Sequence, residues 1–127
     1  MAEFTVFQIE VTRKDHDYIN STGWAGLKHD GMEHFRVKQD LSFDGSSAWH
    51  PDHFTHFSPA LGVEADSLDE VFELTNLWND ESRVSRIRER AHSTSVGDII
   101  CNIETGEYFM VNNFGFEKIE VNDEEYA

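Results

Sequence analysis

Residues 99–111 read Ile-Ile-Cys-Asn-Ile-Glu-Thr-Gly-Glu-Tyr-Phe-Met-Val, and this stretch decides the fold class. Within it, Ile99, Cys101 and Ile103 fall on one face of an extended chain, which predicts a strand. A glycine turn then leads into a second apolar run, which is typical of a hairpin. Extended to Val121, the pattern predicts a three-stranded β-meander with turns at Thr105-Gly106 and Asn112–Gly115: Ile99–Ile103, Tyr108–Val111 and a strand that contains Ile119 and Val121.

A second alternating stretch runs over Phe4–Val11. One face carries the side chains of Thr5, Phe7, Ile9 and Val11, while Gln8 and Glu10 face the other way. This period predicts a half-buried strand. The sequence Thr12–Asp15 resembles a weak helix cap, so we expect a short helix to follow it.

The clearest helix start is Asp66-Ser67-Leu68-Asp69-Glu70. The Ser67 hydroxyl can cap the free amides, Glu70 stands three residues further on, and the acids of the first turn complement the helix dipole. We expect this helix to end near Trp78 or Asn79. The spacing places five side chains on one face of it: Leu68, Val71, Phe72, Thr75 and Trp78.

Weaker signals fill the rest of the sequence. Residues 35–38 and 41–43 suggest a strand region, and Leu61–Ala65 suggests a short strand. Residues 23–31 and 44–60 carry glycines, serines and the two prolines, so they are expected to be mostly irregular. The order of elements lacks a regular βαβ alternation, so the predicted class is α+β, with a mainly antiparallel sheet and one to three helices.

The chain of 127 residues, 39% of them apolar, is large enough to bury a core. We expect one domain over residues 1–121 and an acidic, frayed tail at 122–127. A single cysteine, Cys101, excludes an internal disulfide, and its place in the middle of a strand predicts a small core residue. No apolar run approaches the ~20 residues of a membrane helix and no secretory signal is visible, so a cytoplasmic location is expected.

The charge is the strongest global feature, because 25 acidic residues against 10 basic ones give a net charge of −15. Such a surface repels phosphates, so direct binding of nucleic acid by the bulk surface is disfavoured. Two interpretations stay open. One is a solvated surface that serves solubility. The other is a surface that imitates the phosphates of a nucleic acid and occupies a basic groove of another protein.

Under the second interpretation two acidic stretches form the binding surface, and the partner is a host protein with a basic groove, either a nucleic-acid enzyme or a defence complex. Trp24 and Trp49 are candidate aromatic anchors, with core packing as the alternative for both. The candidate acids are the following: Glu64, Asp66, Asp69, Glu70, Glu73, Asp80 and Glu81, then Glu104, Glu107, Glu117 and Glu120, with Asp123, Glu124 and Glu125 in the tail.

The sequence also carries a pattern that runs through its C-terminal third: Ser93-Thr94-Ser95-Val96-Gly97-Asp98, then Gly106–Val111, then Gly115-Phe116. In order and spacing it resembles a module of small accessory proteins of phages, plasmids and other mobile elements, YodL-like proteins included. Gly97 would allow a tight turn, Asp98 would bond neighbouring amides, and Gly115 would take a positive φ angle. The resemblance implies a mobile-element accessory protein and carries no catalytic residues.

A competing hypothesis rests on histidines. Five of the seven lie between His29 and His56, and imidazole with carboxylate suits a metal or a small polar ligand. The weak candidate ligands are His50, Asp52, His53 and His56. A metal- or small-ligand-binding protein therefore stays an alternative, as does a virion component. The spacing matches no established zinc signature, and neither a metal nor another cofactor is expected.

Four arginines lie within eight positions: Arg83, Arg86, Arg88 and Arg90. On a helix, Arg83, Arg86 and Arg90 would share one face. Such a cluster could grip phosphate, but pairing with the acids of residues 64–81 or plain solvation is the favoured interpretation. Neither a phosphate-binding loop nor a dinucleotide fingerprint is present. Because carboxylates are abundant throughout, their number does not indicate acid–base catalysis. We expect a binding protein without enzymatic activity.

Overall fold

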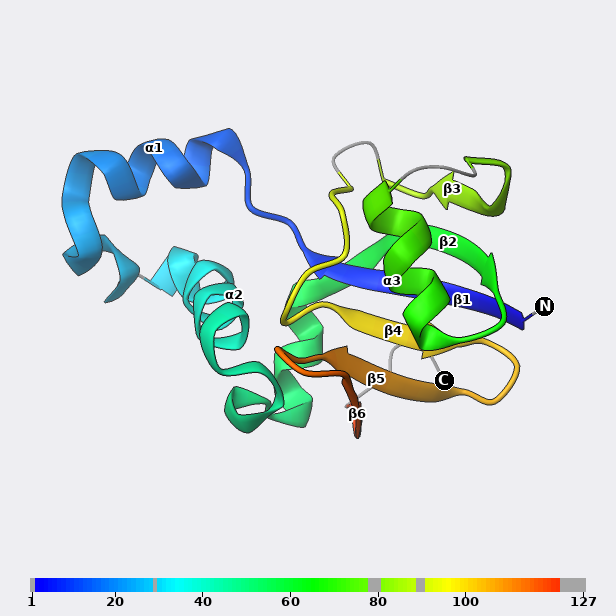
Figure 1. Ribbon diagram of the computed structural model, residues 1–127. Coiled ribbons are helices and arrows are strands. Elements are labelled where there is room, and N and C mark those ends of the chain that lie inside the picture. The colour runs from blue at the N-terminus through cyan, green and yellow to red at the C-terminus, as the bar shows by residue number, and fades with distance from the viewer. Residues whose placement is uncertain (1, 29, 78–80, 89–90, 122–127) are drawn as a thin grey trace.

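A computed structural model describes residues 2–28, 30–77, 81–88 and 91–121 (Figure 1). The predicted α+β class is confirmed, because a six-stranded antiparallel sheet and three α-helices lie within these residues. The strands are β1 (Ala2–Ile9), β2 (Phe57–Ala65), β3 (Val84–Arg86), β4 (Ile99–Asn102), β5 (Glu107–Val111) and β6 (Phe116–Ile119). The α-helices are α1 (Arg13–Thr22), α2 (Glu33–Asp44) and α3 (Leu68–Leu77).

Short 3₁₀ helices occupy much of what was expected to be irregular: Gly23–Lys28, Asp30–Met32, Gly45–Ala48 and Pro51–His56. Another short 3₁₀ helix is Glu81–Arg83. Trp78, Asp80, Arg90, His29 and the tail at 122–127 lie outside the described residues, as do the side chains of Trp24 and Glu81. Among the helices of the described ranges, none combines the length and the apolar character that crossing a membrane requires.

The strand order is β3-β2-β1-β4-β5-β6, so β1 lies inside the sheet between β2 and β4. The predicted meander is confirmed as β4, β5 and β6, each antiparallel to the next. β2 begins earlier than predicted and contains a bulge, because Val6 pairs with Leu61 while Phe7 pairs with Pro59. The proline falls at this irregularity, where a missing ladder hydrogen bond is tolerated.

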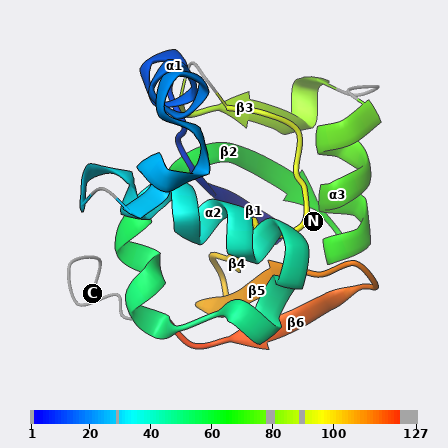
Figure 2. The ribbon, with the colours of Figure 1, turned by 90° about the vertical axis from the view of Figure 1, so that its left-hand side faces the viewer.

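The sheet lies between two layers, and Figures 1 and 2 show α3 on one face and residues 45–56 on the other, with α2 at one end. Phe4 and Val6 of β1 pack in the core beneath α3. Phe7 and Ile9 pack in a second core with Phe54. Cys101 is buried in that second core, as predicted.

The two layers bury β1 from Val6 to Ile9 on both faces, so the prediction that Gln8 lies on an open face is wrong. Gln8 is 0% exposed, and its side chain forms two hydrogen bonds with the main chain of His92. Its Nε2 donates to the His92 carbonyl at 2.8 Å, and its Oε1 accepts from the His92 amide at 3.1 Å. A buried amide side chain is tolerated because these bonds satisfy it.

Both predicted helix caps are confirmed. Thr12 and Asp15 form a reciprocal capping box at α1, and the Ser67 hydroxyl accepts the Glu70 amide at 3.2 Å at α3. The buried face of α3 differs from the predicted one, because Val71, Leu74 and Thr75 are buried while Phe72 is exposed.

One segment adopts the opposite structure to the predicted one, and another is settled by strand pairing. Residues 33–44 form α2, which buries Val37 and Leu41 one turn apart, although an alternating pattern had suggested a strand. Residues 84–86, which were considered only for the case of a helix, form β3 and pair with β2 at Leu61–Val63. The amides of Ile87 and Arg88 both donate to the carbonyl of the bulge residue Ala60, which holds this segment against the sheet.

Candidate functional site: an acidic hollow on the open end of the sheet

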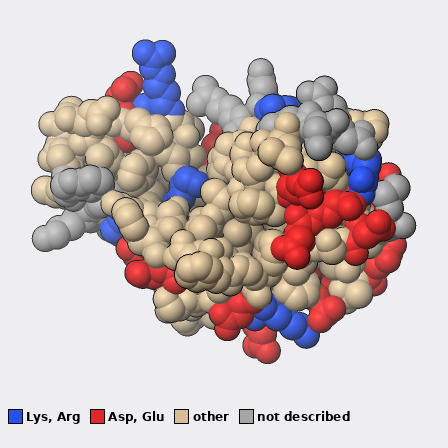
Figure 3. Space-filling view, in the orientation of Figure 1, with Lys and Arg blue, Asp and Glu red and all other residues tan. Residues whose placement is uncertain are grey.

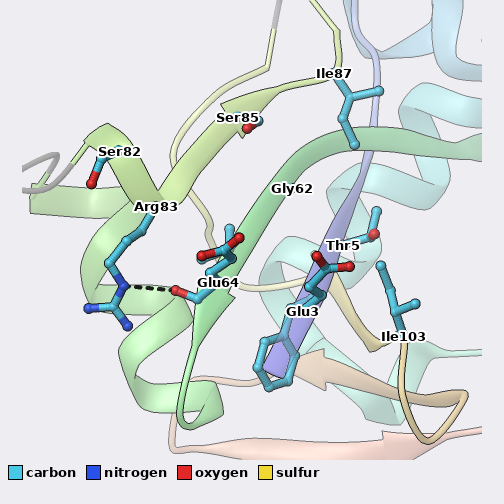
Figure 4. Close-up of a pocket in the computed structure, with 11 residues that line it drawn as sticks. Glu3, Thr5, Gly62, Glu64, Ser82, Arg83, Ser85, Ile87 and Ile103 are labelled. Atoms are coloured by element: carbon cyan, nitrogen blue, oxygen red, sulfur yellow. Dashed lines mark hydrogen bonds between the residues drawn. The ribbon is translucent and has the colours of Figure 1, made fainter. Parts of the chain in front are cut away.

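The second core covers only part of its sheet face. At the other end of that face, the side chains of β1, β2 and β3 surround a hollow of about 270 Å³ (Figure 4). Thr5 and Gly62 are register partners at its floor. Gly62 has no side chain and therefore leaves the floor low. A Cβ built there would extend into the hollow, 3.9 Å from Ile87 Cδ1 and in ordinary van der Waals contact with it.

Two carboxylates stand side by side in this hollow. Glu3 and Glu64 are register partners on adjacent antiparallel strands, and both are exposed. Figure 4 shows the two carboxylates near the centre of the lining residues. Directly opposed side chains on neighbouring strands have Cβ atoms about 5 Å apart, so the two negative charges repel each other. Among the described residues, neither carboxylate pairs with a basic side chain.

Two exposed isoleucines flank the carboxylates. Ile87 is 54% exposed and Ile103 is 53% exposed. Ile87 is placed by its amide bond to Ala60, and Ile103 by the bond from its amide to the Glu3 carbonyl at 3.0 Å. The hollow therefore combines negative charge with apolar walls and with the Thr5 and Ser85 side chains.

Arg83 lies at the edge of the hollow and does not neutralise the carboxylate pair. Its Nε donates to the main-chain carbonyl of Glu64 at 3.0 Å, and its Nη2 forms an ion pair with the Glu70 carboxylate. This pairing confirms the predicted use of an arginine against the acids of residues 64–81. It also means that Glu70 is not an unpaired acid of the surface.

The topology brings one acid from each of the two predicted acidic stretches to the same end of the sheet. Glu64 stands near the end of β2, and Glu104 stands in the turn between β4 and β5, next to Ile103. Glu3 lies between them on β1, because its strand pairs with both β2 and β4. We call Glu3, Glu64 and Glu104 the acidic end. Figure 3 shows acidic side chains gathered over α3 and toward this end, while the surface over α1 and α2 is mostly neutral.

The remaining acidic candidates have separate roles. Asp66, Asp69 and Glu73 are exposed at and along α3. Glu107 forms an ion pair with Lys118 at 3.0 Å, and the hydrogen bond from that ammonium lowers the pKa of the Glu107 carboxyl. Glu117 accepts from Asn112 Nδ2 at 3.3 Å and from the Ser46 hydroxyl.

Trp49 belongs to the packing of the second core. It is half-buried, it lies edge-on to Phe57 with ring centroids 5.9 Å apart, and its Nε1 donates to the Glu120 carbonyl at 2.8 Å. A far more exposed aromatic side chain is Phe114, which is 97% exposed in the turn between β5 and β6. Three exposed apolar residues, Ile87, Ile103 and Phe114, were missed from the sequence, because an apolar residue within a strand or turn pattern is usually assigned to the core.

The described part of the histidine segment offers no metal centre, because no group of three His, Cys, Asp or Glu side chains among the described residues is placed to hold a metal ion. His50 Nδ1 accepts the Asp52 amide at 3.1 Å, and His53 Nδ1 accepts the His50 amide at 3.2 Å, so both rings cap their own 3₁₀ helix. Burial, followed by the neighbouring His50 and His56, lowers the pKa of His53.

Arg86 and Arg88 bond other parts of the protein itself. Arg86 Nη1 donates to the Ala91 carbonyl at 3.1 Å. Arg88 Nη1 donates to the Gln8 carbonyl at 3.3 Å and to the Ser58 hydroxyl. Arg83 and Arg86 do not share a helical face, because Arg83 ends a 3₁₀ helix and Arg86 lies in β3.

A buried polar network lies at the other end of β1 from the acidic end. Asp98 Oδ2 accepts the Ser95 amide at 3.0 Å and Gln8 Nε2 at 3.2 Å, and His92 Nδ1 stands 3.9 Å away. Burial raises the pKa of Asp98 to about 6, although the neighbouring charges of His92 and Lys38 act in the opposite direction. The expected roles of Asp98 in bonding amides and of Gly97 in a tight turn, with φ of 92°, are confirmed.

No protein-family model, curated protein or solved structure matches the chain in the comparisons made with each.

Proposed function

We propose that this chain is a non-enzymatic accessory protein that binds a basic surface of another protein through its acidic end. The observation that carries the proposal is the placement of Glu3, Glu64 and Glu104 together at one end of the sheet, beside exposed isoleucines. Acidic side chains steer a basic partner toward the molecule, and apolar side chains among them add contact area once the two have met.

The partner class in this proposal is a protein with a basic groove that otherwise holds nucleic acid, such as a nucleic-acid enzyme or a defence complex of a bacterial host. The net charge of −15 supports this choice, because the electrostatics that draw DNA into such a groove also draw an acidic protein. The mobile-element setting comes from the sequence resemblance of residues 93–119 alone.

Affinity capture from a bacterial lysate with matched charge variants tests the proposal. One variant carries Glu3→Lys, Glu64→Lys and Glu104→Lys at the acidic end. The control carries Glu10→Lys, Asp17→Lys and Asp44→Lys, which replace acids that are also exposed and change the net charge by the same amount.

We expect nucleic-acid-binding proteins to be captured by the parent chain and by the control variant, but not by the acidic-end variant. Capture should weaken steeply as salt is raised, and a DNA duplex should compete with it. Equal loss in both variants would contradict the proposal, because it would mean that net charge alone causes the binding. Capture that ignores salt and DNA would also contradict it.

A further inference from the structure

We propose that the hollow between Glu3, Glu64, Ile87 and Ile103 receives one arginine side chain of the partner. This inference deepens the proposed function and rests on it. The acidic surface then contains a site with a defined occupant, which is a guanidinium group on an apolar stem.

This part of the sheet face is open. Residues 45–56 pack on the same face against Phe7 and Phe57. Over Thr5 and Gly62 lies the hollow of about 270 Å³, and among the described residues no α-helix contributes to its lining. More than half of the Ile87 and Ile103 surface is exposed beside it. Exposed apolar side chains that line a recess, with charges among them, are typical of a surface that a partner covers.

The placement of the two negative charges favours a guanidinium as the ligand. Glu3 and Glu64 stand opposite each other on neighbouring strands, so their carboxylates approach one ligand from two sides. A guanidinium offers five N–H donors in a planar fork and can bond both carboxylates at once. A lysine ammonium is a compact, strongly hydrated charge that fits such a pair less well. The described residues offer no third ligand that a metal ion would need.

The apolar part of the hollow suits the methylene groups of an arginine side chain. Its methylene groups can lie along Ile87 and Ile103 while the charged end reaches the carboxylates. The chain's own Arg83 does not fill this place, because its guanidinium is held by Glu70 and by the Glu64 carbonyl. Figure 4 shows the Arg83 side chain extending to the side, away from Ile103.

An NMR titration of the full chain tests this assignment with four capped tripeptides as probes. Each has the form Gly-X-Gly, with X as arginine, lysine, citrulline or norleucine. Citrulline has the shape of arginine without its charge, and norleucine supplies an apolar stem alone. We expect the arginine peptide to shift the amide signals of Thr5, Gly62 and Ile103, and to bind about tenfold more tightly than the citrulline peptide.

Two conservative variants make the test specific. Glu64→Gln should weaken the arginine peptide about tenfold, while Glu10→Gln, at an exposed acid away from the hollow, should leave its affinity unchanged. The inference is overturned if citrulline binds as tightly as arginine, if the shifts centre on α3, or if Glu64→Gln has no effect. Lysine binding as tightly as arginine would overturn the assignment of a guanidinium.

The two proposals fail separately. Loss of partner capture in the acidic-end variant, together with no arginine site in the titration, leaves the proposed function and removes this inference. Arginine binding in the hollow, together with unchanged partner capture, removes the proposed function and shows a guanidinium site of another use.

Discussion

At the scale of single residues, Asp98 carries a buried carboxyl group whose protonation affects stability. It bonds Gln8 and the Ser95 amide, and the charges of His92 and Lys38 act on it. Its pKa of about 6 lies above the ordinary 3.8, so the folded chain holds this proton over a range in which the unfolded chain has released it. By linkage, this group's contribution to the free energy of unfolding is largest below that range and is lost as the pH rises through it.

Replacing Asp98 by Asn should therefore remove part of the pH dependence of stability. We expect the free energy of unfolding of Asp98→Asn, relative to that of the parent chain, to rise between pH 4 and pH 6 by up to about 1.4 kcal/mol per pH unit. Urea titrations at several pH values measure this difference. Glu10→Gln, at an exposed acid, is the control and should give a flat difference. A flat difference for Asp98→Asn, or an NMR titration that places the Asp98 pKa near 4, would contradict the prediction.

Single residues also show which features could be predicted from the sequence and which could not. The burial of Cys101 and the amide-bonding role of Asp98 followed from local patterns, and both are confirmed. The burial of Gln8 could not be predicted, because its partners lie on the segment around His92 and Asp98, more than eighty positions away. A polar residue in an alternating strand is assigned to solvent unless such a partner is known.

At the scale of elements, caps and glycine turns were predicted well, while the assignment of weak apolar patterns was not. Phe35 and Val37 alternate with basic residues as in a strand, yet α2 buries Val37 with Leu41 at a helical spacing. Val84 and Ile87 have a helical spacing, yet the exposed edge of β2 pairs with Val84–Arg86 as a strand. Short apolar runs fit both periods, and tertiary pairing decides between them.

The turn before β4 depends on one glycine. Gly97 has a φ of 92°, and a Cβ added there would stand 3.0 Å from the Leu41 main-chain carbon. Gly106 has a φ of 74° with nothing within 4 Å of such a Cβ, so it is a matched control. We expect Gly97→Ala to lower the free energy of unfolding by about 2–4 kcal/mol and Gly106→Ala by about 1 kcal/mol. Thermal and urea unfolding measure both, and equal losses would contradict the role of the Leu41 contact.

The acidic end illustrates the same limit for the candidate site. Glu64 and Glu104 were chosen from the charge of their stretches, and the structure places them at one end of the sheet. Glu3, Ile87 and Ile103 were not chosen, because their proximity depends on the register of β1 with β2 and on the bonds to Ala60 and Glu3. Composition can locate an acidic stretch, but only strand pairing defines a hollow.

At the scale of the whole molecule, the acidic end is expected to lower stability. Glu3 and Glu64 carry like charges directly across two strands in a chain whose net charge is −15. We expect Glu64→Gln to raise the free energy of unfolding by roughly 0.2–1 kcal/mol at low salt, and added salt to reduce this gain. Urea unfolding at two salt concentrations measures it. A loss of stability in Glu64→Gln would contradict the proposed repulsion.

The central place of β1 has a further consequence during synthesis of the chain. The hollow needs Glu3 from the first strand, Gly62 and Glu64 from the second, and Ile103 from the end of β4. A ribosome must release all of these segments before they can pair, and pairings between distant segments form slowly. The nascent chain therefore exposes its acids early but acquires a shaped site only late. A partner that needs the hollow would recognise the finished protein and pass over the incomplete one.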